Sequence, residues 1–183
     1  MLKKFPCDRQ MDMNDCGPAS LKMIARYYGK YYSLQFLRDR CGITREGISF
    51  LDLSYASESI GIRSKSLKCT IDDLLNKIPL PAIIHWDNSH FIVVYKTNPK
   101  REIIYVSDPA KGRVAYTKEQ FAKHWVKKKE GHGALLAVEP QAEFYERRAE
   151  EKTGRKKTME NFIGYFRPFK KSFVNLIIVM LVV

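Results

Sequence analysis

The stretch QMDMNDCGPASLKMIARYYG, residues 10–29, decides how the chain begins to fold. Pro18 fits the first turn of a helix, and Gly29 is a typical helix stop. Apolar side chains recur between them at helical spacing, at Leu21, Ile24 and Tyr28. The pattern therefore predicts a helix that starts beside Cys16, and it leaves open whether this cysteine is a buried thiol or a nucleophile.

More helices are predicted next, and strands after them. Segments 34–41 and 50–60 each follow a serine that can cap a helix, and each precedes a glycine that can end one. A strand is expected at 63–69, followed by a short helix capped by Thr70. Apolar runs of strand length then occupy residues 82–86, 91–96, 102–106 and 134–140. This order favours an α+β fold in which N-terminal helices pack on one side of an antiparallel sheet.

The two central strands can be aligned from the sequence. Asn98 and Pro99 form a turn signal between segments 91–95 and 102–106. A hairpin centred there pairs Tyr95 with Glu102, Phe91 with Val106 and His90 with Ser107. His90 then lies next to Asp108, within reach of a hydrogen bond.

Composition and cysteine spacing narrow the class of protein. The chain has 183 residues, of which 45% are hydrophobic, enough for one sizeable core. The four cysteines form no CxxC pair, and the first residues have no apolar stretch typical of a secretion signal. We therefore expect reduced, cytosolic thiols and no structural metal site.

Part of the net charge of +12 lies near the end of the chain. Residues 141–172 hold nine Lys or Arg against five Glu, and the apolar run 173–183 follows them directly. Basic residues beside an apolar segment are typical of the cytoplasmic flank of a membrane helix. The run has about half of the ~20 residues that a spanning helix needs. We expect the start of a first transmembrane helix; a charged helix or a core strand that closes the domain is the alternative.

Chemistry connects the predicted histidine–aspartate pair to the cysteine. A thiol becomes a good nucleophile when it ionises, which a helix N-terminus and a neighbouring imidazolium both favour. Cys16 has the helix position, His90 could supply the imidazolium, and Asp108 could hold its tautomer. The side-chain amide of Gln10 could join the Cys16 N–H in stabilising an oxyanion.

Structural interpretations compete with this chemistry. Free cysteines are often buried, and Cys41 and Cys69 are expected to be structural. His85 is expected in the core or at its rim, and His124 and His132 on the surface with no acidic partner that spacing predicts. Asp15 is more consistent with a helix cap or a local hydrogen-bond acceptor than with a base. A nucleic-acid-binding function would rest on charge alone, since no aromatic–basic recognition motif is present.

The segments QMDMNDCGPASL, HFIVVYK and VSDPAKG together resemble the C39 family of cysteine peptidases, over about residues 5–140. These are papain-like domains at the N-termini of peptide-exporting ABC transporters. The resemblance implies a nucleophile at Cys16, a base at His90, an orienting acid at Asp108 and an oxyanion donor at Gln10.

The resemblance also implies a function and partners. It suggests removal of a double-glycine leader from a bacteriocin-like or other secreted peptide, coupled to export, at the cytoplasmic face of the membrane. Residues 1–140 would be the peptidase domain, 141–172 a linker and 173–183 the start of the transmembrane part of a homodimeric transporter. No cofactor is expected for the peptidase; ATP and Mg²⁺ would belong to a nucleotide-binding part outside this chain, because no GxxxxGK[ST] motif occurs in it.

Two alternatives stay open at this stage. Some related exporter domains lack the cysteine and only tether a leader peptide. Other enzymes use Cys, His and Asp in the same order, including transglutaminase-like and arylamine acetyltransferase-like proteins; the upstream Gln10 with the Asp-Cys-Gly run favours the peptidase.

Overall fold

The computed structural model describes residues 4–43, 47–127 and 130–147. The predicted membrane segment, residues 173–183, and most of the predicted linker lie outside these ranges. Among the residues described, we find no helix with the length and hydropathy needed to cross a bilayer.

Side-chain caps set the starts of several helices. The helices are α1 (Cys16–Tyr27), α2 (Leu34–Cys41), α3 (Phe50–Ser59), α4 (Ile71–Asn76), α5 (Lys118–Trp125) and α6 (Ala142–Glu146). Ser33, Ser49 and Thr70 each accept a hydrogen bond from a backbone N–H in the first turn of α2, α3 and α4. Gly42 follows α2 in the left-handed conformation, at φ +57°. These helix boundaries confirm the sequence prediction.

In the described ranges, one antiparallel sheet of six strands has the order β1–β6–β2–β3–β4–β5. Its strands are β1 (Ile62–Cys69), β2 (Ala82–Trp86), β3 (His90–Asn98), β4 (Ile103–Asp108), β5 (Gly112–Thr117) and β6 (Gly133–Pro140). Strand β5 was not predicted. It is an edge strand with no fully buried residue, and it lacks the apolar run by which β2, β3, β4 and β6 were recognised.

The predicted register between β3 and β4 is wrong. Val94, and not Phe91, lies opposite Val106, and a bulge interrupts the ladder between Val94 and Lys96. Strand β3 continues to Asn98, and the 3-10 turn η2 (Pro99–Arg101) makes the connection. Glu102, predicted to pair with Tyr95, instead ends this turn at φ +49°.

This shift changes how His90 approaches Asp108. Ser107 was expected opposite His90, but it pairs with Val93. Continuing the observed register by one residue places Asp108 opposite Ile92, diagonal to His90. Diagonal neighbours are ~7–8 Å apart at their Cα atoms, so long side chains still reach one another. The predicted proximity therefore holds through a different pairing.

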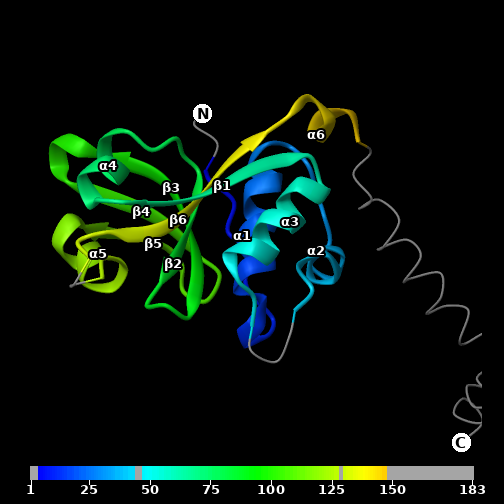
Figure 1. The fold of residues 1–183 in the computed structure, drawn as a ribbon, viewed down its shortest axis with the longest axis horizontal. Helices are drawn as coiled ribbons and strands as arrows, with labels where there is room; N and C mark the ends of the chain where they lie inside the picture. Colours follow the sequence, from blue (N-terminus) through cyan, green and yellow to red (C-terminus); the bar gives the residue numbers. More distant parts are fainter. Residues whose placement is uncertain (1–3, 44–46, 128–129, 148–183) are drawn as a thin grey trace, which may run out of the picture. The chain divides into compact units, whose positions relative to one another are not determined.

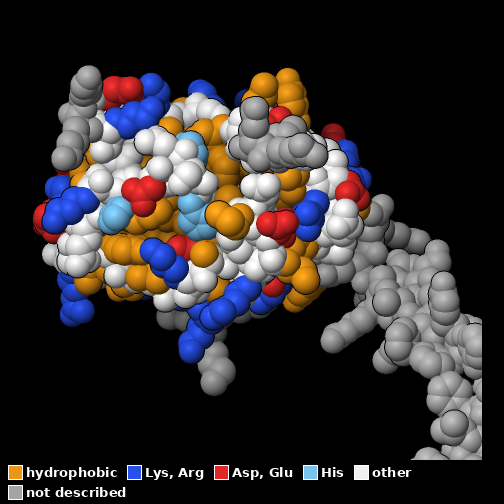
Figure 2. Space-filling model, turned by 90° about the horizontal axis from the view of Figure 1, so that it is seen from below, with side chains coloured by type: hydrophobic (Ala, Val, Ile, Leu, Met, Phe, Trp, Pro, Cys, Tyr) orange, Lys and Arg blue, Asp and Glu red, His pale blue; other side chains and the backbone are white. Residues whose placement is uncertain are grey.

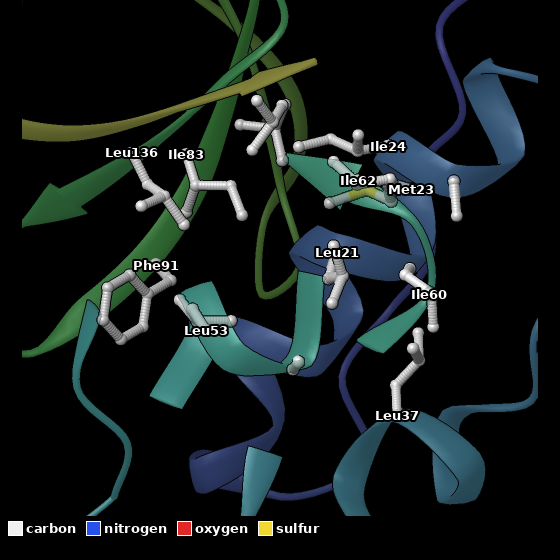
Figure 3. Close-up of a cluster of buried hydrophobic side chains, with 14 of the residues drawn as sticks. Leu21, Met23, Ile24, Leu37, Leu53, Ile60, Ile62, Ile83, Phe91 and Leu136 are labelled. Atoms are coloured by element: carbon white, nitrogen blue, oxygen red, sulfur yellow. The ribbon is translucent and has the colours of Figure 1, made fainter. Parts of the chain in front are cut away.

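Helices α1, α2 and α3 lie on one side of the sheet (Figure 1). Their apolar side chains meet those of the strands in a core cluster, where Leu21 of α1 and Leu53 of α3 are fully buried. Figure 3 shows Leu53 beside Phe91, with Ile83 and Leu136 extending from the sheet toward the helices. Full burial of each such side chain contributes about 1.5–3 kcal/mol to stability.

The other face of the sheet is also covered, so the predicted one-sided arrangement is incomplete. Adjacent residues of β2 point to opposite faces: Ile83 belongs to the first core and Ile84 to a second. Phe121 and Trp125 of α5 fill this second core, together with Leu74 of α4. The sequence of a strand that is buried on both faces is a continuous apolar run. Such a run does not indicate which helices cover each face.

Helix α6 begins two residues after residue 140, the predicted end of the peptidase domain, and it packs against that domain. The boundary at residue 140 stays a prediction. Phe144 is fully buried, and the Gln141 N–H donates to the Gly61 carbonyl at 3.0 Å. Gly61 has φ +83°, and a Cβ there would lie 2.6 Å from the Phe144 nitrogen. Only glycine therefore allows this close approach.

Candidate active site

Cys16 is the first residue of α1, as the sequence predicts, and its side chain is only 5% exposed. The 3-10 turn η1 (Met13–Asp15) precedes it and is closed by a reciprocal pair of hydrogen bonds between Asp12 and Asp15. The backbone N–H groups at this end of α1 and the helix dipole favour an anion. η1 and the start of α1, dark blue in Figure 1, lie at the lower end of the view, and Figure 2 shows this end with histidine and hydrophobic side chains side by side.

His90 and Asp108 form a direct pair. His90 opens β3, and its Nε2 lies 2.8 Å from Oδ1 of Asp108, the last residue of β4. Asp108 is 2% exposed and also accepts a hydrogen bond from the Ala110 N–H at 2.7 Å. Burial raises the pKa of Asp108, but the hydrogen bonds from His90 and Ala110 outweigh it and leave the pKa below its usual value.

His90 also contacts the cysteine. Burial lowers the pKa of His90, but hydrogen bonds with Asp108 and Cys16, and the negative charge of these partners, raise it to about 9. His90 is therefore an imidazolium at neutral pH. Because Asp108 engages Nε2, Nδ1 is the ring nitrogen available to Cys16. His90 thus lies between the carboxylate of Asp108 and the side chain of Cys16.

The thiol opens into a small cavity of about 120 Å³. Its lining comes from η1, the loop before α3 and the β2–β3 hairpin, through Met13, Asn14, Cys16, Gly47, Ile48, His85, Asn88, Ser89 and Phe91. Gly17 lets Ile48, which lines this cavity, pack directly against the start of α1, because a Cβ at residue 17 would lie 1.9 Å from Cδ1 of Ile48. Only a small group fits beside Cys16.

Comparison with known proteins identifies the family of this chain. The model of the peptidase C39 family matches residues 4–141. The chain belongs to the peptidase C39 family.

Curated relatives of this C39 chain are much longer proteins. The lactococcin-G-processing and transport ATP-binding protein LagD of Lactococcus lactis is 34% identical over 140 residues, which cover 74% of this chain and 19% of LagD. The pediocin PA-1 transport/processing ATP-binding protein PedD of Pediococcus acidilactici is 36% identical over 63% of this chain and 17% of its own length. The C39 chain thus spans about a fifth of these relatives.

Solved structures share the fold. A double glycine motif protease from a PCAT transporter, in complex with its leader peptide, is 32% identical with a TM-score of 0.68, over 75% of this chain and 93% of that one. The peptidase domain of Streptococcus ComA is 26% identical with a TM-score of 0.66, over 75% and 99%. The predicted α+β, papain-like architecture of helices on an antiparallel sheet is confirmed.

Gln10 lies in a groove that adjoins the cysteine cavity of the C39 domain. Its backbone N–H donates to the Pro109 carbonyl at 3.1 Å, which ties it to the turn after Asp108. The groove has a volume of about 410 Å³ and shares Met13 with the cavity of Cys16. Within the described ranges the buried Oε1 of Gln10 has no hydrogen-bond partner. The structure thus brings Cys16, His90 and Asp108 together and places Gln10 on the adjacent wall.

His85 lines the cysteine cavity as a second, neutral imidazole. It is half-buried, stacked on Phe91 with ring centroids 4.9 Å apart. Burial and the positive charge of Lys127 lower its pKa. The expected place at the rim of the core is confirmed.

Two side-chain pairs near the site were missed from the sequence. His124 of α5 pairs with Asp87 of the β2–β3 hairpin at 3.0 Å, so this surface histidine does have an acidic partner. Asp15 accepts a hydrogen bond from the Asp12 N–H, as a local acceptor, and it also forms an ion pair with Arg38 of α2. Both pairs join residues far apart in the chain, and neither has a signal in spacing.

Cys41 and Cys69 were expected to be structural. Both are buried, and burial, with the nearby charges of Asp52 and Asp73, raises their pKa values to about 12 and about 11. Neither thiol ionises at neutral pH, in agreement with the structural role expected for them.

Proposed function

We propose that this C39 domain is a cysteine endopeptidase that removes double-glycine leader peptides, with Cys16 as nucleophile, His90 as acid and base, and Asp108 as its orienting partner. The observation that carries the proposal is the position of His90, hydrogen-bonded to Asp108 at 2.8 Å and in contact with the cysteine at the start of α1.

The geometry supports a two-step acyl transfer. The Cys16 thiolate attacks the scissile carbonyl carbon, a C–S bond forms, and the carbonyl electron pair moves onto oxygen. As the tetrahedral species collapses, the C–N bond breaks and the His90 imidazolium gives its proton to the leaving amine. Neutral His90 then takes a proton from water while the hydroxide attacks the thioester. The C–S bond breaks, and the thiolate and the imidazolium are restored.

The oxyanion needs donors on the side of Cys16 away from His90. The backbone N–H of Cys16 is one candidate, and the side-chain amide of Gln10, across the shared residue Met13, is the other. Such a pair has no cost of reorganisation during the reaction, and loss of one donor typically costs about 3–4 kcal/mol in the transition state. The unpartnered amide oxygen of Gln10 leaves its side chain free to turn its NH₂ group toward a bound substrate.

Size supports glycine as the residue before the cleaved bond. The cavity beside Cys16 has only about 120 Å³, and Phe91, Ile48 and His85 wall it. A larger side chain would clash with these groups. The PCAT protease, which resembles this chain, is a double glycine motif protease.

The rest of the system is proposed from the longer relatives. LagD and PedD are processing and transport ATP-binding proteins. We infer that this domain acts at the cytoplasmic face of the membrane, beside transmembrane and ATP-binding parts of a homodimeric exporter that use ATP and Mg²⁺. The peptidase reaction itself needs no cofactor.

The alternative function is a module that binds the leader peptide without cutting it, and the experiment must distinguish this from peptidase activity. The test incubates the chain with a synthetic precursor peptide that carries a Gly-Gly leader and locates the cut by mass spectrometry. We expect one cut after the second glycine, and none with Cys16→Ala, while that variant still binds the leader. Cys7→Ala is the matched control, since Cys7 lies outside the residues that line the cavity. Binding without cleavage by the unaltered chain would favour the tethering module.

A further inference from the structure

The structure buries a carboxylate immediately before the nucleophile. Asp15 is 0% exposed, lies at the start of α1 and makes no side-chain capping hydrogen bond to that helix. Its Oδ2 accepts the N–H of Asp12 at 3.0 Å, which holds the η1 turn closed. Its Oδ1 has no aligned hydrogen bond among the described residues.

Arg38 is the cation that faces this carboxylate. Its Nε lies 3.3 Å from Oδ1 of Asp15, and its side chain reaches from α2 while remaining 33% exposed. A buried charge that loses its partner is strongly unfavourable. An unpaired carboxylate here would also compete with the Cys16 thiolate for the positive end of the α1 dipole.

The other groups around Cys16 cannot replace this compensation. His90 of β3 is already shared between Asp108 of β4 and the thiol. His85 of β2 lines the cavity but is kept neutral by its lowered pKa. Asp12 is exposed and would add negative charge.

We propose that Arg38 is a positioning residue for the nucleophile: by neutralising buried Asp15 across the α1–α2 contact, it leaves the start of α1 free to stabilise the Cys16 thiolate. The ion pair also connects α2 to η1, so the place of α2 affects both the charge and the position of the thiol. The role in turnover rests on the proposed peptidase function, whereas the effect on the thiolate does not.

The experiment measures alkylation of Cys16 by iodoacetamide against pH, located by mass spectrometry, in parallel with leader cleavage. In Arg38→Met we expect the midpoint of the alkylation curve to rise by about one pH unit, which is about a tenfold slower reaction at pH values below the midpoint of the unaltered chain. Arg38→Lys should restore most of the rate. Arg40→Met is the matched control, because Arg40 lies on the same helix, stacks on Phe36 and has no carboxylate partner among the described residues.

A double variant tests the route through Asp15. Asp15→Asn with Arg38→Met removes both charges, and the alkylation rate should return to within about twofold of the unaltered chain. This variant leaves neither charge of the pair unpaired. We therefore expect it to fold, and it can be measured even if Arg38→Met alone does not fold. Asp15→Asn alone should react at least as fast as the unaltered chain.

The outcomes separate the two proposals. An unchanged midpoint in Arg38→Met, or a double variant as slow as Arg38→Met, would overturn the role of Arg38. A shifted midpoint in a chain that never cleaves a leader would overturn the peptidase function and leave this role intact. A drop in melting temperature with no change in the midpoint would reduce the ion pair to a structural contact.

Discussion

Replacing Asp108 with asparagine tests the centre of the site, because it removes the charge that holds a proton on His90. The substituted side chain keeps a similar shape and an oxygen for the same hydrogen bond. In the unaltered chain burial lowers the pKa of His90, and the partners Asp108 and Cys16 raise it, from 6.5 to about 9. Loss of one neighbouring carboxylate typically lowers such a pKa by about 1–3 units, or about 1.4–4 kcal/mol.

The sign of the pH effect follows directly. His90 must be protonated to give its proton to the leaving amine, so the alkaline limb of kcat/KM lies near the pH at which His90 loses that proton. For a fall in the pKa of about 1.5 units, the imidazolium fraction at pH 8 drops from about 90% to about 25%. The alkaline limb should therefore move to lower pH, and turnover at pH 8 should lose roughly fourfold from this cause alone.

The assay combines the pH profile of leader cleavage with an NMR titration of the imidazoles. The chain has only four histidines, so each signal can be assigned with single variants. Asp87→Asn is the matched control, since Asp87 pairs with His124 and should leave the titration of His90 unchanged. Titration of His90 at the same pH in Asp108→Asn would refute the reasoning.

Other predictions concern catalysis and packing. His90→Ala should slow leader cleavage more than Asp108→Asn, because the first removes the acid and base and the second only its orientation and charge; the opposite order of kcat values would refute these roles. Phe144→Ala should lower the free energy of unfolding by about 3–5 kcal/mol in urea denaturation, since the ring is fully buried; a loss below about 1 kcal/mol would show that α6 does not belong to the folded unit. Gly17→Ala should cost about 1–3 kcal/mol and displace Ile48 from the cavity wall, which a lower kcat/KM with Gly-Gly leaders would report; unchanged stability and kinetics would contradict the tight contact.

The sequence by itself determined the local features of this protein. Ser33, Ser49 and Thr70 cap helices where they were predicted to, because a cap is a contact between residues two or three apart. The position of Cys16 at the start of α1 follows from Pro18 and the helical spacing behind it. The resemblance of three short segments to the C39 family implies the four residues of the candidate site, and their catalytic roles stay predictions.

Only the tertiary structure decided how distant segments meet. The bulge after Val94 and the longer strands set the register between β3 and β4, and no residue of the turn signal at Asn98 could report it. The second core under α5, the His124–Asp87 pair and the Asp15–Arg38 ion pair likewise depend on packing between elements. A cap or a turn is specified by a few neighbouring residues, whereas a register or a buried ion pair is selected by the total burial and charge compensation that the whole fold allows.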